Sequence, residues 1–289
     1  MNGIAICFLC LFVYAPLVTY QAPPPPKEPL RQEEVFVRIQ DNVKNIQKVK
    51  LFLEQVKSAS PLLSKISSNA NALNDVVTRR KIKLTREYLM SLTLDAFALQ
   101  LIAYELKNLK TFDETSTQKV VRRLQEVASD LELKFRYINK IASSNGDSGN
   151  RSSNHASLVF RGIGQPDDLF FHSKSGIAAP RMLSVSTQLD DLPALEVDVI
   201  VNTRDSNGTV VNGYAVWYVP NFLEDSAEFY NSFGSLTSPM KKSLAVGNYK
   251  MWTRAPDGSL GEKTPVNPGD DNKKEMRVDL LIPRGVQDD

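Results

Sequence analysis

Cysteine and histidine are scarce in this chain of 289 residues, which contains two of each. Both cysteines, Cys7 and Cys10, lie inside an apolar N-terminal run, so the rest of the chain has no thiols from which a disulfide framework could form. The sequence places no carboxylate cluster beside His155 or His172, and we interpret both as surface or structural residues. This scarcity argues against a small disulfide-stapled module and gives no support to a histidine metal centre.

The sequence also lacks the short motifs of common enzyme classes. There is no Gly-x-Ser-x-Gly nucleophile elbow, no His-Glu-x-x-His zinc motif and no phosphate-binding P-loop. Asp205, Asn207 and Gly208 resemble part of a calcium loop, but its terminal glutamate is missing, which favours a hairpin turn. We therefore predict no metal and no other cofactor. We favour a non-enzymatic protein, and an enzyme with its site in the loops of the C-terminal half is the alternative.

A strong net charge is missing as well, because 35 basic side chains nearly balance 33 acidic ones. The formal charge of +2 does not indicate a nucleic-acid-binding protein. The two halves differ, since residues 30–142 hold 20 basic and 13 acidic side chains (+7), whereas residues 143–289 hold 14 and 19 (−5).

Basic residues concentrate in one short run of the first half, which consists of Arg79, Arg80, Lys81, Lys83 and Arg86. Such a run attracts an anionic polymer, lipid headgroups or an acidic partner domain, so it is a candidate interaction surface. A solvated helix surface is the favoured interpretation, because amphipathic helices normally place lysine and arginine outward.

The N-terminus predicts export. Residues 3–20 carry no charge, and a proline-rich stretch follows them directly. We interpret residues 1–22 as a signal peptide and residues 23–32 as a semi-rigid spacer. The alternative is a single-span membrane anchor through residues 3–20, because this run approaches the length that crosses a bilayer. Either interpretation predicts a secreted, periplasmic or cell-envelope protein.

Apolar residues recur at helical spacing over residues 33–142 and predict an antiparallel bundle of three or four helices. Thr111 and Glu114 have the spacing of a capping box at a helix start. The run around Leu99 has the widest apolar stripe and is predicted to be the most buried. The second and third helices are either separate or continuous through residues 81–83, and association into a homo-oligomer through this part is left open.

Residues 143–155 are small and polar, which predicts a flexible linker where a protease would release two folded fragments. Over residues 156–285 the pattern changes to an alternation of apolar and polar residues, with turn signals between short runs. This pattern predicts an antiparallel β-sandwich. The Asn-Gly pair at residues 207–208 is typical of a tight hairpin, so the strands around 195–201 and 214–219 are predicted to be antiparallel neighbours.

Three segments of this half carry a family resemblance. Residues 197–218 contain the hairpin, residues 244–252 contain a Gly-Asn-Tyr sequence before a strand, and residues 277–283 contain a further strand. Together, over residues 192–284, they resemble the transthyretin-like β-sandwich of carboxypeptidase-regulatory and PEGA-type modules in secreted bacterial proteins. The resemblance implies a domain that presents or supports other domains. Two long loops depart from a compact module and leave room for a binding surface.

Trp217 and Trp252 lie in predicted strands beside tyrosines, a composition found both in sheet cores and at interfaces. We favour core packing, with an exposed recognition platform as the alternative. The sequence as a whole predicts a non-enzymatic exported or cell-envelope protein with a helical association domain and a β-sandwich interaction module. Its partner is an unidentified protein or envelope polymer, and a membrane-anchored sensor is a further alternative.

Overall fold

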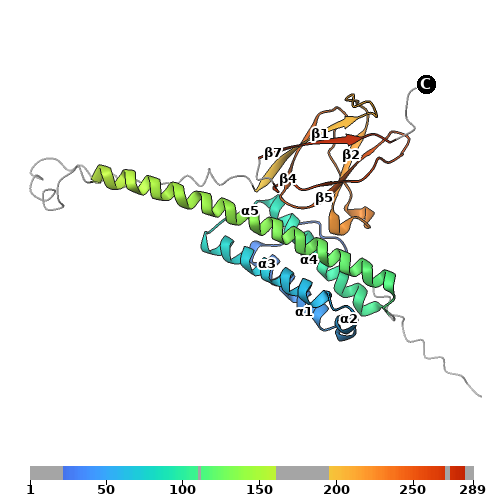
Figure 1. The fold of residues 1–289 in the computed structure, drawn as a ribbon, viewed down its shortest axis with the longest axis horizontal. Helices are drawn as coiled ribbons and strands as arrows, with labels where there is room; N and C mark the ends of the chain where they lie inside the picture. The colour runs from blue at the N-terminus through green and yellow to red at the C-terminus, as the bar shows by residue number, and fades with distance from the viewer. Residues whose placement is uncertain (1–21, 110–111, 161–194, 271–273, 284–289) are drawn as a thin grey trace, which may run out of the picture.

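The computed structural model describes residues 22–109, 112–160, 195–270 and 274–283, with helices preceding β-sheets (Figure 1). This confirms the predicted order of helices followed by strands. The predicted signal or anchor, apart from Ala22, lies outside the described residues. The α-helices in the described chain are α1 (Gln32–Gln47), α2 (Lys50–Gln55), α3 (Ala59–Arg79), α4 (Arg86–Asn108) and α5 (Glu114–Phe160).

A Schellman motif ends α3. The N–H of Ile82 donates to the carbonyl of Val77 (2.9 Å), and the N–H of Lys81 donates to the carbonyl of Thr78 (3.2 Å). Lys81 adopts the left-handed conformation that this motif requires, with φ of 52°. The chain therefore turns between α3 and α4, and the alternative of one helix running through residues 81–83 is wrong.

Side-chain caps fix the starts of the next two helices. Thr85 precedes α4, and its Oγ1 accepts a hydrogen bond from the N–H of Tyr88 (3.2 Å). Asp113 precedes α5 in the same way, because its Oδ1 accepts from the N–H of Ser116 (2.8 Å). The predicted capping residue Thr111 lies outside the described residues.

Helix α4 forms the apolar centre of the helical half. It contacts α1 and α5, and Leu99 is fully buried, as the wide apolar stripe predicts. In the described part of the chain it is the one helix long and apolar enough to cross a membrane, but 61% of its apolar window is buried inside the protein. This burial is typical of a core helix.

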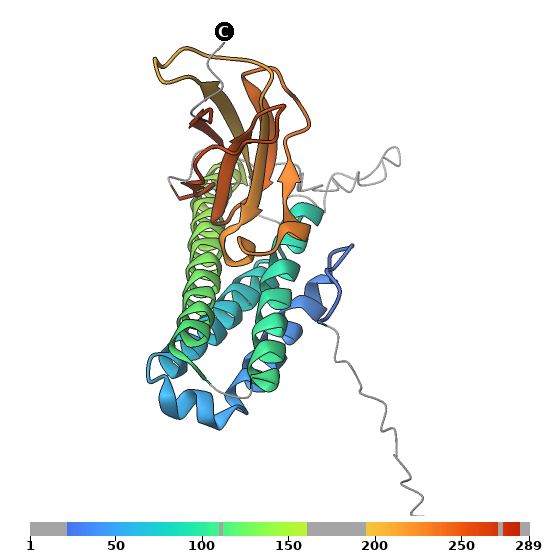
Figure 2. The same ribbon diagram turned by 90° about the vertical axis from the view of Figure 1, so that its right-hand side faces the viewer.

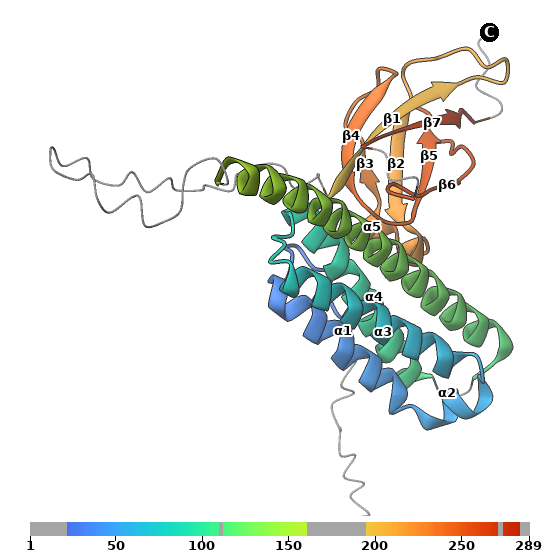
Figure 3. The same cartoon turned by 60° about the vertical axis from the view of Figure 1, so that its left-hand side comes forward.

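Helix α5 continues over residues 143–155, where composition predicts a flexible linker. Helix therefore replaces the irregular structure expected there. No proline occurs between residues 114 and 160, so no residue type that blocks a helix sterically interrupts it. Gly146 and Gly149 weaken a helix by only about 1 kcal/mol each relative to alanine. Figure 3 shows α5 running between α3 and the β region.

The strands form two sheets, one with the order β4-β1-β7 and the other with the order β3-β2-β5-β6. Strands β1 and β7 pair in parallel, and the other pairs are antiparallel. The prediction of purely antiparallel pairing is therefore wrong. The strands are β1 (Glu196–Arg204), β2 (Ala215–Pro220), β3 (Asn231–Ser232), β4 (Met240–Ala245), β5 (Tyr249–Arg254), β6 (Thr264–Val266) and β7 (Glu275–Leu281), with 3-10 helices η3 (Asn221–Leu223) and η4 (Ala227–Phe229) between β2 and β3.

The turn after β1 forms, but it does not make β1 and β2 neighbours. The Asp205 carboxylate accepts hydrogen bonds from the N–H groups of Asn207 (2.9 Å) and Thr209 (2.8 Å), and Gly208 has φ of 83°. A single bridge joins Arg204 to Val210, after which β2 enters the other sheet. The predicted pairing is wrong because a tight turn fixes only the local chain reversal, whereas burial decides which sheet each strand joins.

One hydrophobic core passes from the helices into the β region. It includes Leu99 of α4, Val246 of the turn between β4 and β5, and Trp252 of β5. The rings of Phe97 and Phe229 lie 5.4 Å apart across the same boundary. Figure 2 shows the β region seated on one end of the helices. The helical half and the β half therefore share one core, although the composition predicts a flexible linker between them at residues 143–155.

Candidate functional site

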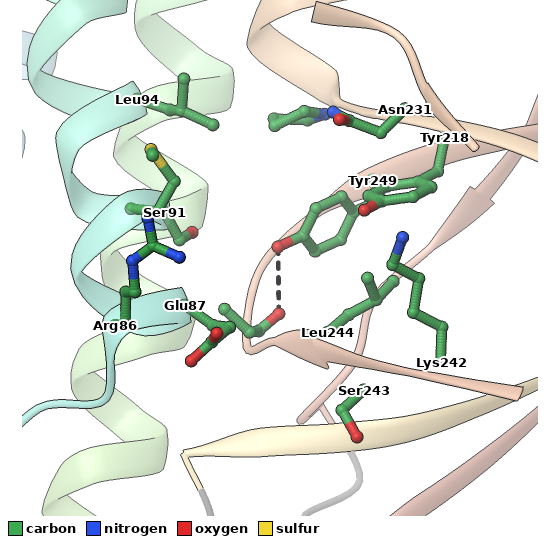
Figure 4. Close-up of a pocket in the computed structure, with 13 residues that line it drawn as sticks. Arg86, Glu87, Ser91, Leu94, Tyr218, Asn231, Lys242, Ser243, Leu244 and Tyr249 are labelled. Atoms are coloured by element: carbon green, nitrogen blue, oxygen red, sulfur yellow. Dashed lines mark hydrogen bonds between the residues drawn. The ribbon is translucent and has the colours of Figure 1, made fainter. Parts of the chain in front are cut away.

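A pocket of about 270 Å³ lies where α4 meets the two sheets (Figure 4). One wall of the pocket comes from α4, and the other walls come from strands of both sheets. The helical wall consists of Arg86, Glu87, Met90, Ser91 and Leu94. The β wall consists of Tyr218, Pro220, Asn231, Lys242, Ser243, Leu244, Ala245 and Tyr249.

The local sequence explains why these side chains converge. Residues 87, 90, 91 and 94 of α4 are spaced by three and four positions, which places them on one face of a helix. In β4, Met240, Lys242 and Leu244 alternate with outward residues, and Met240 and Leu244 are buried in the core between the sheets. Lys242 is therefore a charged residue on the face of β4 that otherwise packs into the core between the sheets.

Two tyrosines form the aromatic wall. The Tyr218 ring packs edge-on against Phe233 (5.6 Å between centroids) and Tyr249 (6.1 Å), and the Tyr249 hydroxyl donates to the carbonyl of Ala245 (3.1 Å; Figure 4). Burial raises the pKa of Tyr218 to about 12 and also raises the pKa of Tyr249. Both phenols are therefore neutral at physiological pH, and the wall offers rings and hydroxyl groups to a ligand.

The pocket contains two cations. The Lys242 ammonium lies 5.1 Å from the centroid of the Tyr218 ring and donates to the carbonyl of Ser232 (2.9 Å). Burial lowers the pKa of Lys242. Among the described residues, no carboxylate lies within 4 Å of Lys242 or Arg86, whereas the adjacent Lys241 pairs with Asp198 at 2.8 Å.

One carboxylate lines the pocket, and a second lies close to it. Glu87 is the acidic residue of the lining. Burial raises the pKa of Glu196 on β1, and the neighbouring Glu87 carboxylate raises it further, because two like charges oppose each other. The lining itself therefore has two cationic groups and one acidic group.

A buried charge cluster behind the pocket fixes its β wall. Lys134 of α5 bridges Asp130 of the same helix (2.5 Å) and Asp95 of α4, and all three side chains are buried. Asp130 Oδ1 also accepts a hydrogen bond from the N–H of Asn248 (2.5 Å) in the turn that leads to Tyr249. A Cβ on Gly247 would lie 3.0 Å from that oxygen, so the close approach favours glycine. The cluster thereby ties both helices to the strand that carries Tyr249.

The charge states of this cluster follow from burial and proximity. Burial raises the pKa of Asp95 well above its ordinary value, and the Lys134 ammonium opposes that shift. Burial alone would lower the pKa of Lys134, but the carboxylates of Asp130 and Asp95 raise it overall. Lys134 therefore remains an ammonium in the folded protein.

A second ionic contact joins α5 to the segment after β2. Arg122 pairs with Asp225 at 2.9 Å, and Arg123 pairs with Glu105 of α4 at 2.6 Å. Glu126 lies one turn further along α5, and its side chain is 21% exposed. Burial raises the pKa of Glu126 from 4.5 to about 7.

This raised pKa predicts that stability falls as pH rises. The folded protein binds the Glu126 proton more tightly than the unfolded chain does, so this contribution is complete below about pH 4.5 and is lost as pH rises through about 7. After discounting for residual solvent, we expect Glu126→Gln to remove about 1–2 kcal/mol of the decrease between pH 5 and pH 8. Urea unfolding of both proteins at several pH values measures this difference. Equal pH slopes for wild type and variant would refute it, and Glu114→Gln, at an exposed glutamate of the same helix, is the control.

The structure separates the basic residues that the sequence groups together. All five are exposed, but Arg86 alone among them lines the pocket described above. Arg79 pairs with Asp75 (3.2 Å), and Lys81 and Lys83 line a different hollow near the start of α1.

The tryptophans lie outside the pocket. Trp252 is 2% exposed and packs edge-on against Tyr230 at 4.8 Å. Trp217 is its cross-strand neighbour and is partly buried, with the Arg254 guanidinium 5.6 Å from its ring.

Other candidate residues are placed as follows. Asp205 directs its carboxylate to backbone amides of its own turn. His172 lies outside the described residues, as do both cysteines, and the side chain of His155 is not described. In the part of the chain that the structure describes, no group of three or more His, Cys, Asp or Glu side chains is arranged to hold a metal ion.

Sequence reasoning missed most of the pocket, including Tyr218, Lys242 and Tyr249. A signal for Lys242 was present, because a lysine between Met240 and Leu244 stands at an inward position of a strand. No comparable signal marks the tyrosines, which resemble ordinary strand residues.

No model of a known protein family matches the chain, and no curated protein is significantly similar to it.

Proposed function

We propose that this is a non-enzymatic, exported binding protein whose ligand occupies the pocket between α4 and the two sheets. The observation that carries the proposal is the lining: helix and sheets line one hollow, and its two cations, Arg86 and Lys242, have no carboxylate partner among the described residues. Concave sites with apolar walls and a few polar groups are typical of ligand-binding sites.

In this proposal the helical half is an antiparallel bundle that mediates association, and the β half is a sandwich of the transthyretin-like kind. The shared core and the Asp95–Lys134–Asp130 cluster support a rigid relation between the two. A site built on such elements is held more precisely than one on loops alone. The macromolecular partner of the protein is a second protein or an envelope polymer.

Export is tested by mass spectrometry of the mature protein purified from its native source. A mature N-terminus near residue 22 is the expected result, because residues 1–22 are proposed to be a cleaved signal. Retention of Met1 would replace the secreted form with the membrane-anchored alternative.

Binding is tested with 1-octanol as a small apolar probe. We expect saturation-transfer NMR signals from octanol with the wild-type protein and their loss in Leu94→Trp, because the larger side chain fills the pocket. Leu236→Trp is the matched control, since Leu236 is 55% exposed and is not part of the pocket lining.

Melting curves establish that each variant is folded, and Met90→Trp serves as a second filling variant if Leu94→Trp is unstable. Octanol signals of equal strength in wild type and a folded filling variant would mean that the pocket is not the binding site.

A further inference from the structure

We infer that the pocket binds a small molecule that carries one carboxylate on an apolar body, with Lys242 as the anchor of the carboxylate. The inference rests on the proposed function, because it specifies the ligand of the same site.

Lys242 is the first residue that indicates an anionic ligand. The residue is partly buried, its ammonium makes one described hydrogen bond, to the carbonyl of Ser232 (2.9 Å), and two of its N–H groups remain for another acceptor. An anion bound beside this partly buried ammonium would accept a charge-assisted hydrogen bond from it. The adjacent Lys241 already has such a partner, because it pairs with Asp198 at 2.8 Å.

The helical wall of the pocket also favours a negatively charged ligand. Arg86 is the first residue of α4, and the N-terminus of this helix adds a partial positive charge to the same wall. Figure 4 shows Arg86 and Lys242 on facing walls of the hollow. With Glu87 as the acidic residue of the lining, the formal charge of the lining is +1, which complements a monoanion better than a phosphate dianion.

The uncharged residues of the lining indicate the size and polarity of the rest of the ligand. Met90 and Leu94 of α4 face Pro220, Leu244 and the ring of Tyr218 across the pocket, and these groups offer no charge. A hollow of about 270 Å³ lies just below the usual range for ligand sites, which starts at about 300 Å³. The body is therefore a short alkyl chain or a single ring.

The test compares three probes that share one body and differ in the head group: octanoate, 1-octanol and octylammonium. Isothermal titration with the full mature protein is expected to give octanoate at least about tenfold tighter binding than octanol, and octylammonium the weakest binding. Lys242→Met, which keeps the apolar stem, is expected to weaken octanoate at least about tenfold and to leave octanol within about twofold.

Lys241→Met is the matched control, because this neighbouring lysine is outside the lining, and it should leave all three affinities within about twofold. Two results would show that the ligand class is wrong while the proposed function survives. The first is that Leu94→Trp abolishes the binding of octanol or octylammonium but octanoate binds the wild-type protein no tighter than octanol. The second is that Lys242→Met leaves the affinity for octanoate unchanged. If no probe distinguishes wild type from Leu94→Trp, the proposed function itself fails.

Discussion

Replacing Lys134 by methionine is expected to destabilise the protein by about 3–5 kcal/mol, the range for breaking a buried ion pair by removing one partner. The ammonium is the shared partner of Asp95 and Asp130, and no part of the three side chains is appreciably exposed. Without it, two carboxylates would face each other in the core, and one of them would have to remain protonated. The free energy of unfolding from urea denaturation measures the loss.

Lys65→Met is the matched control for this prediction. Lys65 also forms an ion pair with α5, to Glu132 at 2.7 Å, but its side chain is 50% exposed. A pair in that setting contributes about 0–1 kcal/mol. A loss in Lys134→Met as small as in Lys65→Met would show that the buried cluster does not join the helices to the β region. Adding Asp95→Asn to Lys134→Met should recover part of the stability, because a neutral amide replaces a carboxyl group that would otherwise have to stay protonated in the core.

The sequence carried a signal for this cluster that the apolar pattern obscured. Asp95 stands three positions after Leu92 and four before Leu99, and Lys134 stands in the same relation to Leu131 and Ile138. Both charges therefore lie on stripes that are otherwise apolar, and a charge at such a position requires a partner. Periodicity could not pair the two residues, because nothing local shows which faces of the helices meet.

The order of helices and strands was predictable because periodicity is a local property. Residues recurring every three or four positions predicted the long helices, and alternation predicted β1, β2 and β7, whereas β3, β4 and β6 were not predicted. The turn at Lys81 that follows α3 was not predictable, because lysine rarely adopts a positive φ and nothing in the composition marks the turn.

Strand pairing and the pocket depend on contacts between distant segments. The parallel pairing of β1 with β7 joins residues about 80 positions apart, and no turn signal specifies it. The pocket joins residues 86–94 to residues 218–249, so the sequence could single out Arg86 only as a member of a basic run. Such long-range juxtapositions follow from which faces are buried together, and local patterns along a sequence do not specify that.

The two tryptophans are expected to differ sharply in their contribution to stability, although they are cross-strand neighbours in β2 and β5. Trp252 is 2% exposed, belongs to the core that joins helices and sheets, and packs against Tyr230. Truncating a buried tryptophan to alanine leaves a large cavity, so Trp252→Ala should cost about 3–5 kcal/mol.

Trp217→Ala is the matched comparison and should cost less than half as much. Its ring is only partly buried, and its indole Nε1 is buried without a hydrogen-bond partner among the described residues, so truncation also removes an unsatisfied polar group. Urea unfolding followed by circular dichroism measures both losses. Equal losses would show that Trp217 is as much a core residue as Trp252. An unchanged unfolding curve for Trp217→Ala, together with weaker binding to a captured partner, would make Trp217 a recognition residue on the outer face of its sheet.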